Sequence, residues 1–339
     1  MNLKNFSYKE LQDYLITLGL PKYRGNQIFT WVYRRKACDW DEMTDLPKEL
    51  RKVFQDRGVS LGCISLVSQI QADDGTAKYL FKLDDGETVE SVYLPESDRH
   101  TVCFSTQVGC GMGCLFCATG QRGIVRNLSA AEIVDQPLRI SRITGSRISS
   151  LVAMGQGEPL INYDSLLKAI RIINDPQGMG IGARHITIST CGIIPGIQKL
   201  ADEQLQVNLA ISLHAADNQL RDSLMPINRK YPLEKLIEAC RLYLSHTNRR
   251  ITFEYTLIDG VNDRPVDLHN LIRLLSGMLC HVNLIPFNPI PNSNYRRSKA
   301  ERIREFAAGL KQAHIETTIR KERGSEFAAA CGQLQSRLS

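Results

Sequence analysis

The sequence predicts an α/β fold in which a small helical module and a short β extension precede a partial barrel of strands and helices. Three observations lead to this prediction. Strand-like and helix-like segments alternate over residues 101–320, residues 61–100 hold two alternating segments around a turn, and residues 1–60 show helical periodicity. Repeated strand–helix units require a parallel sheet, because only a long crossover can join parallel neighbours. We expect about six such strands, curled into a full or partial barrel.

Residues 1–60 are expected to form the helical module. Leu11, Leu15 and Leu18 recur at helical spacing, a second helix would pass through Trp31, and a short third one would cover residues 46–53. Aromatic and basic residues interleave in this region, which would suit base stacking and phosphate binding in RNA recognition. A packed core beneath a solvated basic face explains the same pattern equally well.

Residues 61–100 are expected to form a small antiparallel sheet. Two alternating segments, Lys78–Leu83 and Thr88–Leu94, flank the sequence Asp84-Asp85-Gly86-Glu87, which is a typical hairpin signal. Glu90 lies inside the second segment. Judged by itself, this glutamate would be expected to face solvent.

Residues 101–320 are expected to form the barrel. The strand candidates are residues 101–105, 148–154, 185–189, 207–213, 251–257 and 281–286, with a further one at 315–319. Helices are predicted at 165–173, 265–275 and 302–310, and the capping box Ser129-Ala130-Ala131-Glu132 opens the first barrel helix. Pro137 falls inside that helix, where it would delete a hydrogen bond. In such folds functional side chains gather at the carboxyl ends of the strands.

A glycine-rich loop with three cysteines follows the first barrel strand. Cys110, Cys114 and Cys117 have C-x3-C-x2-C spacing within GCGMGCLFCATG at residues 109–120. The glycines disfavour a helix in the first half of this segment, so a loop that folds three thiolates around one centre is expected. Three thiolates on a four-iron cluster leave one iron open for a small ligand. An incomplete zinc site or inert buried thiols remain alternatives, although no fourth ligand follows at zinc-finger spacing.

Composition sets broad limits. The chain has 339 residues, a net charge of +6, 43% hydrophobic and 23% charged residues, which suits a globular protein with a mild basic bias. Neither a signal peptide nor a membrane-spanning run is evident, so we expect a cytoplasmic protein. Ten cysteines in such a protein indicate metal or redox chemistry rather than a disulfide framework. Five cysteines that stand alone in the sequence are interpreted as small buried apolar residues, namely Cys38, Cys63, Cys191, Cys240 and Cys280.

Further polar residues follow the predicted strands. Glu158 in the turn Gly155-Gln156-Gly157-Glu158-Pro159 could hold an ammonium group, and Ser189 could bind a ribose or a carboxylate. A tight turn is the alternative explanation of the glycines, although their expected position beside the cysteine loop favours a binding role. A lone histidine such as His214 is more often a core residue than a ligand. Cys331 lies among small residues near the carboxyl end, where an inert thiol and a nucleophile are equally plausible.

The motifs taken together resemble those of the RlmN/Cfr family of radical S-adenosylmethionine (SAM) RNA adenine methyltransferases. The resemblance covers nearly the whole chain and rests on seven ordered segments, with LPKYRGNQI at 20–28 in the helical module as an eighth. The seven are VESVYLPE at 89–96, CFSTQVGCGMGCLFCATG at 103–120, GQGEPLIN at 155–162, TISTCGIIP at 187–195, LAISLHAADNQLRDSLMPIN at 209–228, NLIPFNP at 283–289 and AACGQL at 329–334. This resemblance implies a TIM-type radical SAM barrel, a partial (β/α)6 barrel, with a tail at 321–339 that carries a methyl-accepting cysteine.

The resemblance also implies roles for individual residues. Cys110, Cys114 and Cys117 would hold a 4Fe–4S cluster, whose open iron would bind SAM. The residues expected to line the SAM pocket are Gly157, Glu158, Ser189, Ser212, Leu213, His214 and Asn288. Cys331 matches the methyl-carrying cysteine of the family, Cys103 the cysteine that forms a disulfide with it, and Glu90 the general base.

The implied reaction is methylation of an adenine in 23S rRNA and in tRNA, with two SAM molecules per turnover, an external electron donor and a monomeric enzyme. Pro159 and Pro286 resemble the subfamily that methylates carbon 2, because the carbon 8 type tends to have Ala and Arg at these positions. Many relatives have Met where Gln156 stands. The candidate RNA-binding cations are Arg34, Arg35, Lys36, Arg122, Arg126, Arg296 and Arg297.

Two alternatives remain for the function. The chain could methylate carbon 8 or act on another RNA, or it could be a non-catalytic RNA-binding protein that uses its cluster as a redox sensor. Cys103 and Cys331 together disfavour a sensor, which needs neither.

Overall fold

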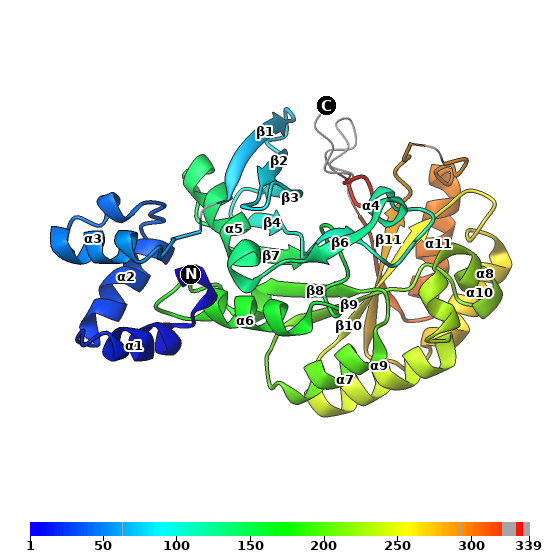
Figure 1. The fold of residues 1–339 in the computed structure, drawn as a ribbon. Coiled ribbons are helices and arrows are strands. Elements are labelled where there is room, and N and C mark those ends of the chain that lie inside the picture. Colours follow the sequence, from blue (N-terminus) through cyan, green and yellow to red (C-terminus); the bar gives the residue numbers. More distant parts are fainter. Residues whose placement is uncertain (63, 292, 321–329, 335–339) are drawn as a thin grey trace.

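The strand-like runs beyond residue 100 form one parallel sheet in the computed structural model, which describes residues 1–62, 64–291, 293–320 and 330–334 (Figure 1). The strands lie in chain order, and each pairs in parallel with the next. They are β4 (His100–Cys103), β7 (Ser150–Ala153), β8 (Ile186–Thr190), β9 (Asn208–Ser212), β10 (Ile251–Leu257), β11 (Cys280–Pro286) and β12 (Glu316–Ile319). Within the described residues β4 and β12 do not pair with each other, so the barrel is partial.

Helices connect these strands and cover the outer face of the sheet. They are α5 (Ala130–Thr144), α6 (Tyr163–Asn174), α7 (Ile194–Asp202), α8 (Asn218–Leu224), α9 (Leu233–Thr247), α10 (Pro265–Leu275) and α11 (Ala300–Gln312). Short 3-10 turns lie at Ala183–His185 and Pro226–Arg229. The predicted capping box at Ser129 is present, and Pro137 lies inside α5 as expected.

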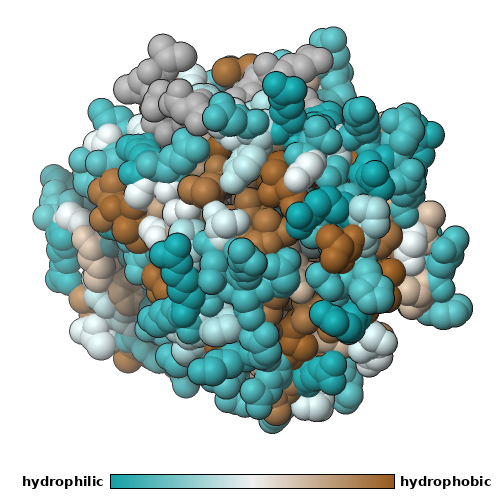
Figure 2. Space-filling view, turned by 90° about the vertical axis from the view of Figure 1, so that its right-hand side faces the viewer, coloured by the Kyte–Doolittle hydropathy of each residue, from teal (hydrophilic) through white to brown (hydrophobic). Residues whose placement is uncertain are grey.

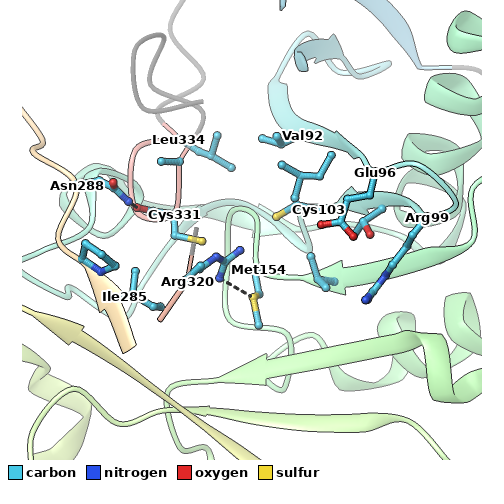
Figure 3. Close-up of a pocket in the computed structure, with 15 residues that line it drawn as sticks. Val92, Glu96, Arg99, Cys103, Met154, Ile285, Asn288, Arg320, Cys331 and Leu334 are labelled. Atoms are coloured by element: carbon cyan, nitrogen blue, oxygen red, sulfur yellow. Dashed lines mark hydrogen bonds between the residues drawn. The ribbon is translucent and has the colours of Figure 1, made fainter. Parts of the chain in front are cut away.

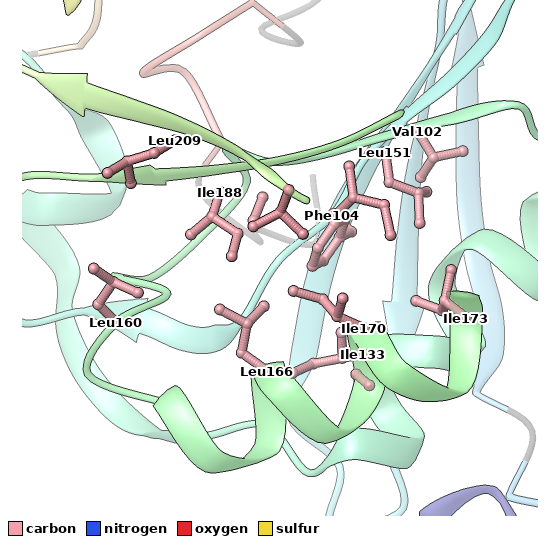
Figure 4. Close-up of a cluster of buried hydrophobic side chains, with 14 of the residues drawn as sticks. Val102, Phe104, Ile133, Leu151, Leu160, Leu166, Ile170, Ile173, Ile188 and Leu209 are labelled. Carbon is pink, nitrogen blue, oxygen red and sulfur yellow. The ribbon is translucent and has the colours of Figure 1, made fainter. Parts of the chain in front are cut away.

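The core between sheet and helices consists of close-packed aliphatic side chains. Strand residues such as Leu151 and Ile188 meet Ile133 of α5 and Ile170 of α6, and all four are at most 1% exposed (Figure 4). Full burial of one such side chain contributes about 1.5–3 kcal/mol. This packed layer fixes the strands, and with them the loops that leave their carboxyl ends.

The β extension belongs to the same sheet as the barrel. β1 (Ser65–Gln71), β2 (Ala77–Lys82) and β3 (Thr88–Pro95) form an antiparallel meander, and β3 continues the sheet by pairing with β4. The predicted hairpin is therefore confirmed, but the extension is not a separate sheet, and β1 was not predicted. Every residue of β1 is exposed, so this edge strand has no buried face to generate an alternating pattern.

The amino-terminal module is helical, as predicted. It contains α1 (Tyr8–Thr17), α2 (Tyr23–Tyr33) and α3 (Lys48–Asp56), with 3-10 turns at Leu3–Asn5 and Trp40–Glu42. Tyr33 is buried, whereas Trp31 is half-buried beneath the guanidinium of Arg35, which lies 4.1 Å from the ring centroid. The aromatic residues of this module thus divide between its core and its surface.

A buried ion pair attaches this module to the barrel. The ammonium group of Lys4 contacts the carboxylate of Asp135 on α5, and both side chains are at most 1% exposed. The same carboxylate accepts the backbone N–H of Ile64 at 2.6 Å. A second link is Asn5, whose side chain accepts the N–H of Ala131 at 2.9 Å.

The surface on the side of α8 and α10 is mainly hydrophilic, with hydrophobic side chains gathered in patches near its middle (Figure 2). Among the described residues no helix combines the length and apolar character required to cross a membrane.

Candidate active site

The three-cysteine loop forms a hairpin after the first barrel strand. β5 (Gln107–Cys110) pairs with β6 (Gly123–Asn127), and the short helix α4 (Ala118–Arg122) lies between them. Gly109 has φ +74°, and a Cβ at this position would come within 2.1 Å of the Gly123 carbonyl oxygen. Only glycine fits there, so the backbone of the loop is fixed by its sequence.

The three cysteines line one inner cavity of about 160 Å³. Most of the residues predicted for the SAM pocket line it too, namely Gly157, Glu158, Ser189, Ser212, His214 and Asn288. Leu213 does not line this cavity. It is fully buried, and its backbone N–H donates to the Glu254 carbonyl oxygen at 3.0 Å.

The sulfurs of the inner cavity lie in a desolvated environment with backbone donors nearby. Burial raises the pKa of Cys110 to about 12, although the amides of Met112 and Gly157 hydrogen-bond its sulfur. Burial, Cys117 and Cys110 raise the pKa of Cys114 well above its ordinary value. Three thiolates in this place would therefore need a positive group among them. No three His, Cys, Asp or Glu side chains of the described chain are arranged to hold one metal ion.

The turn after β7 brings Glu158 to the wall of the inner cavity. Gly157 has φ +100°, and a Cβ there would lie 2.6 Å from the Gln107 Cβ, so the turn packs directly against β5. The two carboxylate oxygens of Glu158 accept the backbone N–H groups of Leu160 at 3.0 Å and Cys191 at 2.8 Å. Burial raises the pKa of Glu158, and these two hydrogen bonds oppose the increase.

Two serines end neighbouring strands on the same wall. The Oγ atoms of Ser189 on β8 and Ser212 on β9 are 3.4 Å apart. Beneath them the buried guanidinium of Arg221 donates to the carbonyl oxygens of Cys191 at 2.8 Å and Leu213 at 3.1 Å. Arg221 thus connects the carboxyl ends of β8 and β9 and fixes the position of both serines.

His214 is held as a neutral residue. Its Nδ1 accepts the backbone N–H of Thr256 at 3.0 Å, and its ring packs edge-on against Phe116 of the cysteine loop at 4.6 Å. Burial, with Arg221 nearby, lowers its pKa to about 3. Its φ of +58° is unusual for a residue other than glycine, and such a conformation persists only where the surroundings fix it.

The described part of the tail, residues 330–334, packs against the cysteine loop. The Gly332 carbonyl oxygen accepts the N–H of Ala118 at 2.7 Å, and the Leu334 carbonyl oxygen accepts the Thr119 hydroxyl at 2.7 Å. On its other side Asn288 donates to the Cys331 carbonyl oxygen at 3.3 Å. These contacts place Cys331 beside a loop that lies more than 200 residues earlier in the chain.

A second, outer cavity of about 350 Å³ adjoins the inner one. Cys331 lines both, and so do Met154, Asn288 and Arg320 (Figure 3). Cys103 lines the outer cavity and points into it from β4. Burial raises the pKa of Cys103 to about 12. A volume of this size is within the range of small-molecule pockets, roughly 300–1,000 Å³.

Glu90 is buried, so the expectation that it faces solvent is wrong. Its side chain is 5% exposed, and its carboxylate lies 3.1 Å from the ammonium group of Lys78 on β2. It lies on the same face of β3 as Val92, which lines the outer cavity, but it does not line that cavity itself. The alternating pattern of β3 could not show that both faces of this strand are covered.

Several of the candidate RNA-binding cations have acidic or carbonyl partners. Arg126 pairs with Asp85 at 2.6 Å and with Glu132 at 2.8 Å, and Arg122 lies 3.6 Å from Glu87. The side chain of Arg297 donates to the Phe287 carbonyl oxygen and to Asn288. The ammonium group of Lys36 donates to the Ser141 carbonyl oxygen at 3.2 Å, and Arg34 to the Pro176 carbonyl oxygen at 2.6 Å.

Comparison with known proteins identifies the family. The model of the radical SAM superfamily matches residues 104–272, and that of the ribosomal RNA large subunit methyltransferase N-terminal domain matches residues 1–58. A dual-specificity RNA methyltransferase RlmN from Syntrophobacter fumaroxidans is 49% identical over 98% of this chain and 97% of its own length. The chain belongs to the RlmN family of radical SAM methyltransferases.

Other RlmN relatives and a solved structure agree with this assignment. A probable dual-specificity RNA methyltransferase RlmN from Caldanaerobacter subterraneus is 48% identical over 98% of this chain and 97% of its own. The crystal structure of a radical SAM methyltransferase from Sphaerobacter thermophilus is 48% identical, has a TM-score of 0.96, and covers 99% of this chain and 100% of its own. The predicted radical SAM fold is therefore confirmed.

Several polar residues in or beneath the cavity walls of this RlmN-family chain were not predicted from its sequence. Glu254 on β10 and Arg320 after β12 line the inner cavity, and Arg221 lies beneath it. Arg221 falls inside the segment at 209–228 that carries the family resemblance, which could have drawn attention to it. For Glu254 and Arg320 the only signal was their position at or just beyond a predicted strand.

Proposed function

We propose that this chain methylates carbon 2 of an adenine in 23S rRNA and in tRNA, with a 4Fe–4S cluster and SAM as cofactors and Cys331 as the methyl carrier. The observation that carries the proposal is the place of Cys331 at the boundary between two cavities. Three further cysteines line the inner cavity, and Cys103 lines the outer one. The relatives named dual-specificity RNA methyltransferases support both RNA classes as substrates.

The donor set of the inner cavity fits an iron–sulfur cluster. Cys110, Cys114 and Cys117 would each bind one iron, and the fourth iron would remain for a small ligand. The cationic irons would supply the positive charge that three half-buried thiolates, packed into one cavity, require. The amides of Met112 and Gly157 at Cys110 are hydrogen-bond donors of the kind that tune cluster sulfurs.

The remaining walls of the inner cavity suit SAM. Ser189 and Ser212 present hydroxyls near adjacent strand ends, and Glu158 would take the ammonium group. His214 is neutral and supports the cysteine loop through Phe116. When bound, the two cofactors would supply an electrophilic methyl group and, after one-electron reduction by an external donor, a 5′-deoxyadenosyl radical.

The chain's own residues would carry the methyl group to the base. Cys331 Sγ would take the methyl group at the inner cavity and present it toward the outer cavity, where the adenine would bind. Glu90 would remove the ring proton, and Cys103 would attack Sγ of Cys331 to release the product as a disulfide forms. Glu90 lies on β3, whose Val92 and Leu94 line the outer cavity. The ion pair between Glu90 and Lys78 would have to break before Glu90 could act as this base.

Two prolines favour carbon 2 over carbon 8 as the methylated atom. Pro286, at the end of β11, lines that cavity directly. The carbon 8 type tends to have Arg at this position, which would add both bulk and charge where the adenine would lie. Pro159, the second distinguishing residue, is buried in the turn that follows Glu158.

The proposal is tested by mass spectrometry of adenosines from rRNA and tRNA treated with the reconstituted protein, SAM and a reductant. We expect 2-methyladenosine in both RNAs. Cys114→Ala is the matched control, and we expect it to lose iron and to give no methylated adenosine. Formation of 8-methyladenosine would overturn the carbon 2 assignment. A zinc-loaded, colourless protein with full activity, or unmodified RNA from an iron-loaded protein, would contradict the proposal as a whole.

A further inference from the structure

Arg320 is half-buried and stands where the two cavities meet. Arg320 is the first residue after β12, and its backbone N–H donates to the Leu284 carbonyl oxygen at 2.9 Å, which continues the sheet by one step. Its side chain lines both the inner and the outer cavity. The backbone of Arg320 is thus anchored to β11, while its guanidinium lies in the space through which the methyl group would pass.

The guanidinium is directed at the sulfur-containing residues around this boundary. It lies between Cys331 and Met154, with Cys103 beyond them (Figure 3). Its Nη1 lies 3.8 Å from the Sδ of Met154, which is a weak acceptor and leaves most of the donor capacity available to other groups. Cys331 makes the largest electrostatic contribution to the pKa of Arg320 and raises it, with smaller contributions from Glu254 and Cys103.

The other ionisable groups near Cys331 are acidic, in contrast to Arg320. Cys103 on β4 and Cys117 of the cysteine loop both interact with Cys331, and each would repel a second thiolate. Glu254 lines the inner cavity and is an acid that burial disfavours in its charged form. Of the described residues that line both cavities together with Cys331, Arg320 is the one that carries a positive charge.

We propose that Arg320 is a positioning residue that holds Sγ of Cys331, as the anion, at the boundary of the two cavities during methyl transfer. The thiolate attacks the methyl carbon of SAM, an S–CH₃ bond forms at Cys331, and the sulfonium–methyl bond breaks to release neutral S-adenosylhomocysteine. The thiolate charge and the sulfonium charge cancel in this step, so no other reactant is needed. Arg320 then faces a neutral thioether and no longer restrains it, which lets the methylated side chain turn toward the outer cavity.

This inference rests on the proposed function, and its test measures the first methyl transfer alone. The full-length, cluster-loaded protein is treated with SAM in the absence of RNA and reductant, and the methyl group on the peptide that contains Cys331 is followed by mass spectrometry. We expect Arg320→Met to methylate Cys331 about tenfold or more slowly than wild type, because the compensating charge is lost. Arg320→Lys keeps the charge and should recover most of the rate.

Two further measurements separate this role from a structural one. Added guanidinium ion should accelerate methylation in Arg320→Ala and leave the wild type unchanged, which a purely structural role does not predict. Arg250→Met is the matched control, because Arg250 pairs with Glu316 at the opposite end of β12 and lines neither cavity. We expect its rate to equal that of wild type.

The outcomes distinguish the inference from the function on which it rests. If the wild type methylates Cys331 and Arg320→Met does so at an equal rate, the role of Arg320 is wrong while the proposed function stands. If the iron-loaded wild type leaves Cys331 unmethylated, the proposed function itself fails. If Arg320→Met does not fold, the other two variants provide the test. Slow methylation of Cys331 in Arg320→Lys, together with no acceleration of Arg320→Ala by guanidinium, would overturn the inference.

Discussion

At the scale of single residues, the site depends on glycines, which have no side chain, as much as on the residues whose side chains line it. Gly157 shows this clearly, because the turn after β7 must approach β5 more closely than any Cβ permits. The carboxylate of the next residue, Glu158, then reaches the amides of Leu160 and Cys191. Loss of this close approach would displace Glu158 from the wall of the inner cavity.

We therefore predict that Gly157→Ala destabilises the protein and weakens SAM binding. The strain of a positive φ and the overlap with Gln107 should together cost about 2–4 kcal/mol. Gly86→Ala is the control, because Gly86 has φ +90° but no atom within 4 Å of its Cβ position, so only the strain remains. Urea unfolding and SAM titration measure both effects. Equal stability losses in the two variants would contradict the role of close packing.

His214 predicts a dependence of stability on pH. Its pKa is lowered to about 3 in the folded protein, below its ordinary value of 6.5, because the charged form is desolvated. The unfolded chain therefore binds more protons between these two values, so this residue's contribution to stability falls as the pH drops from 6.5 toward 3. The slope reaches about 1.4 kcal/mol per pH unit.

The effect can be isolated with His214→Asn, which tolerates the positive φ but does not titrate. We expect the free energy of unfolding, measured in urea at pH 7 and pH 5, to decrease less in this variant than in wild type. Identical decreases would show that His214 is not buried as a neutral residue.

At the scale of elements, the attachment of the amino-terminal module to α5 is the contact that a sequence could least reveal. Lys4 and Asp135 are 131 residues apart and would each pass for a surface charge. The structure buries them together and gives the carboxylate a second partner in the N–H of Ile64. Removal of one member leaves the other charged, buried and without its counter-ion.

Lys4→Met should accordingly lower the free energy of unfolding by about 3–5 kcal/mol. The double variant Lys4→Met, Asp135→Asn should recover part of this loss, because the amide oxygen still accepts the Ile64 N–H. Lys168→Met is the control, since Lys168 pairs with Glu10 in an exposed position, and it should cost about 1 kcal/mol or less. A single variant as stable as the control would contradict the ion pair's role.

The features that could be predicted from the sequence are those with a regular or specific residue pattern. The barrel strands were located because their apolar residues form short continuous runs between turns, and the cysteine loop because its spacing is specific. β1 was missed because it is exposed at every residue, and Glu90 was placed wrongly because both faces of β3 are covered. Arg221 and Arg320 were missed because a sequence does not distinguish an arginine that lies under or lines a cavity from a surface arginine.

At the scale of the whole molecule, the curved sheet brings together residues from the first strand and the tail. Cys103 and Cys331 line one cavity although 228 positions separate them in the sequence. Residues 330–334 reach this place through contacts with α4 on one side and Asn288 on the other. Sequence patterns do not show that residues so far apart in the chain lie close together in space. The pairing of these two cysteines was predicted only from the family resemblance.

The proposed function assigns delivery of the carbon to Cys331 and its release to Cys103. The most direct measurement is mass spectrometry of Cys103→Ala after incubation with RNA, SAM and reductant. We predict a covalent adduct in which the Cys331 sulfur is joined through one carbon to an adenine, because no thiol remains to attack that sulfur. Clean release of methylated RNA from this variant would contradict the claim.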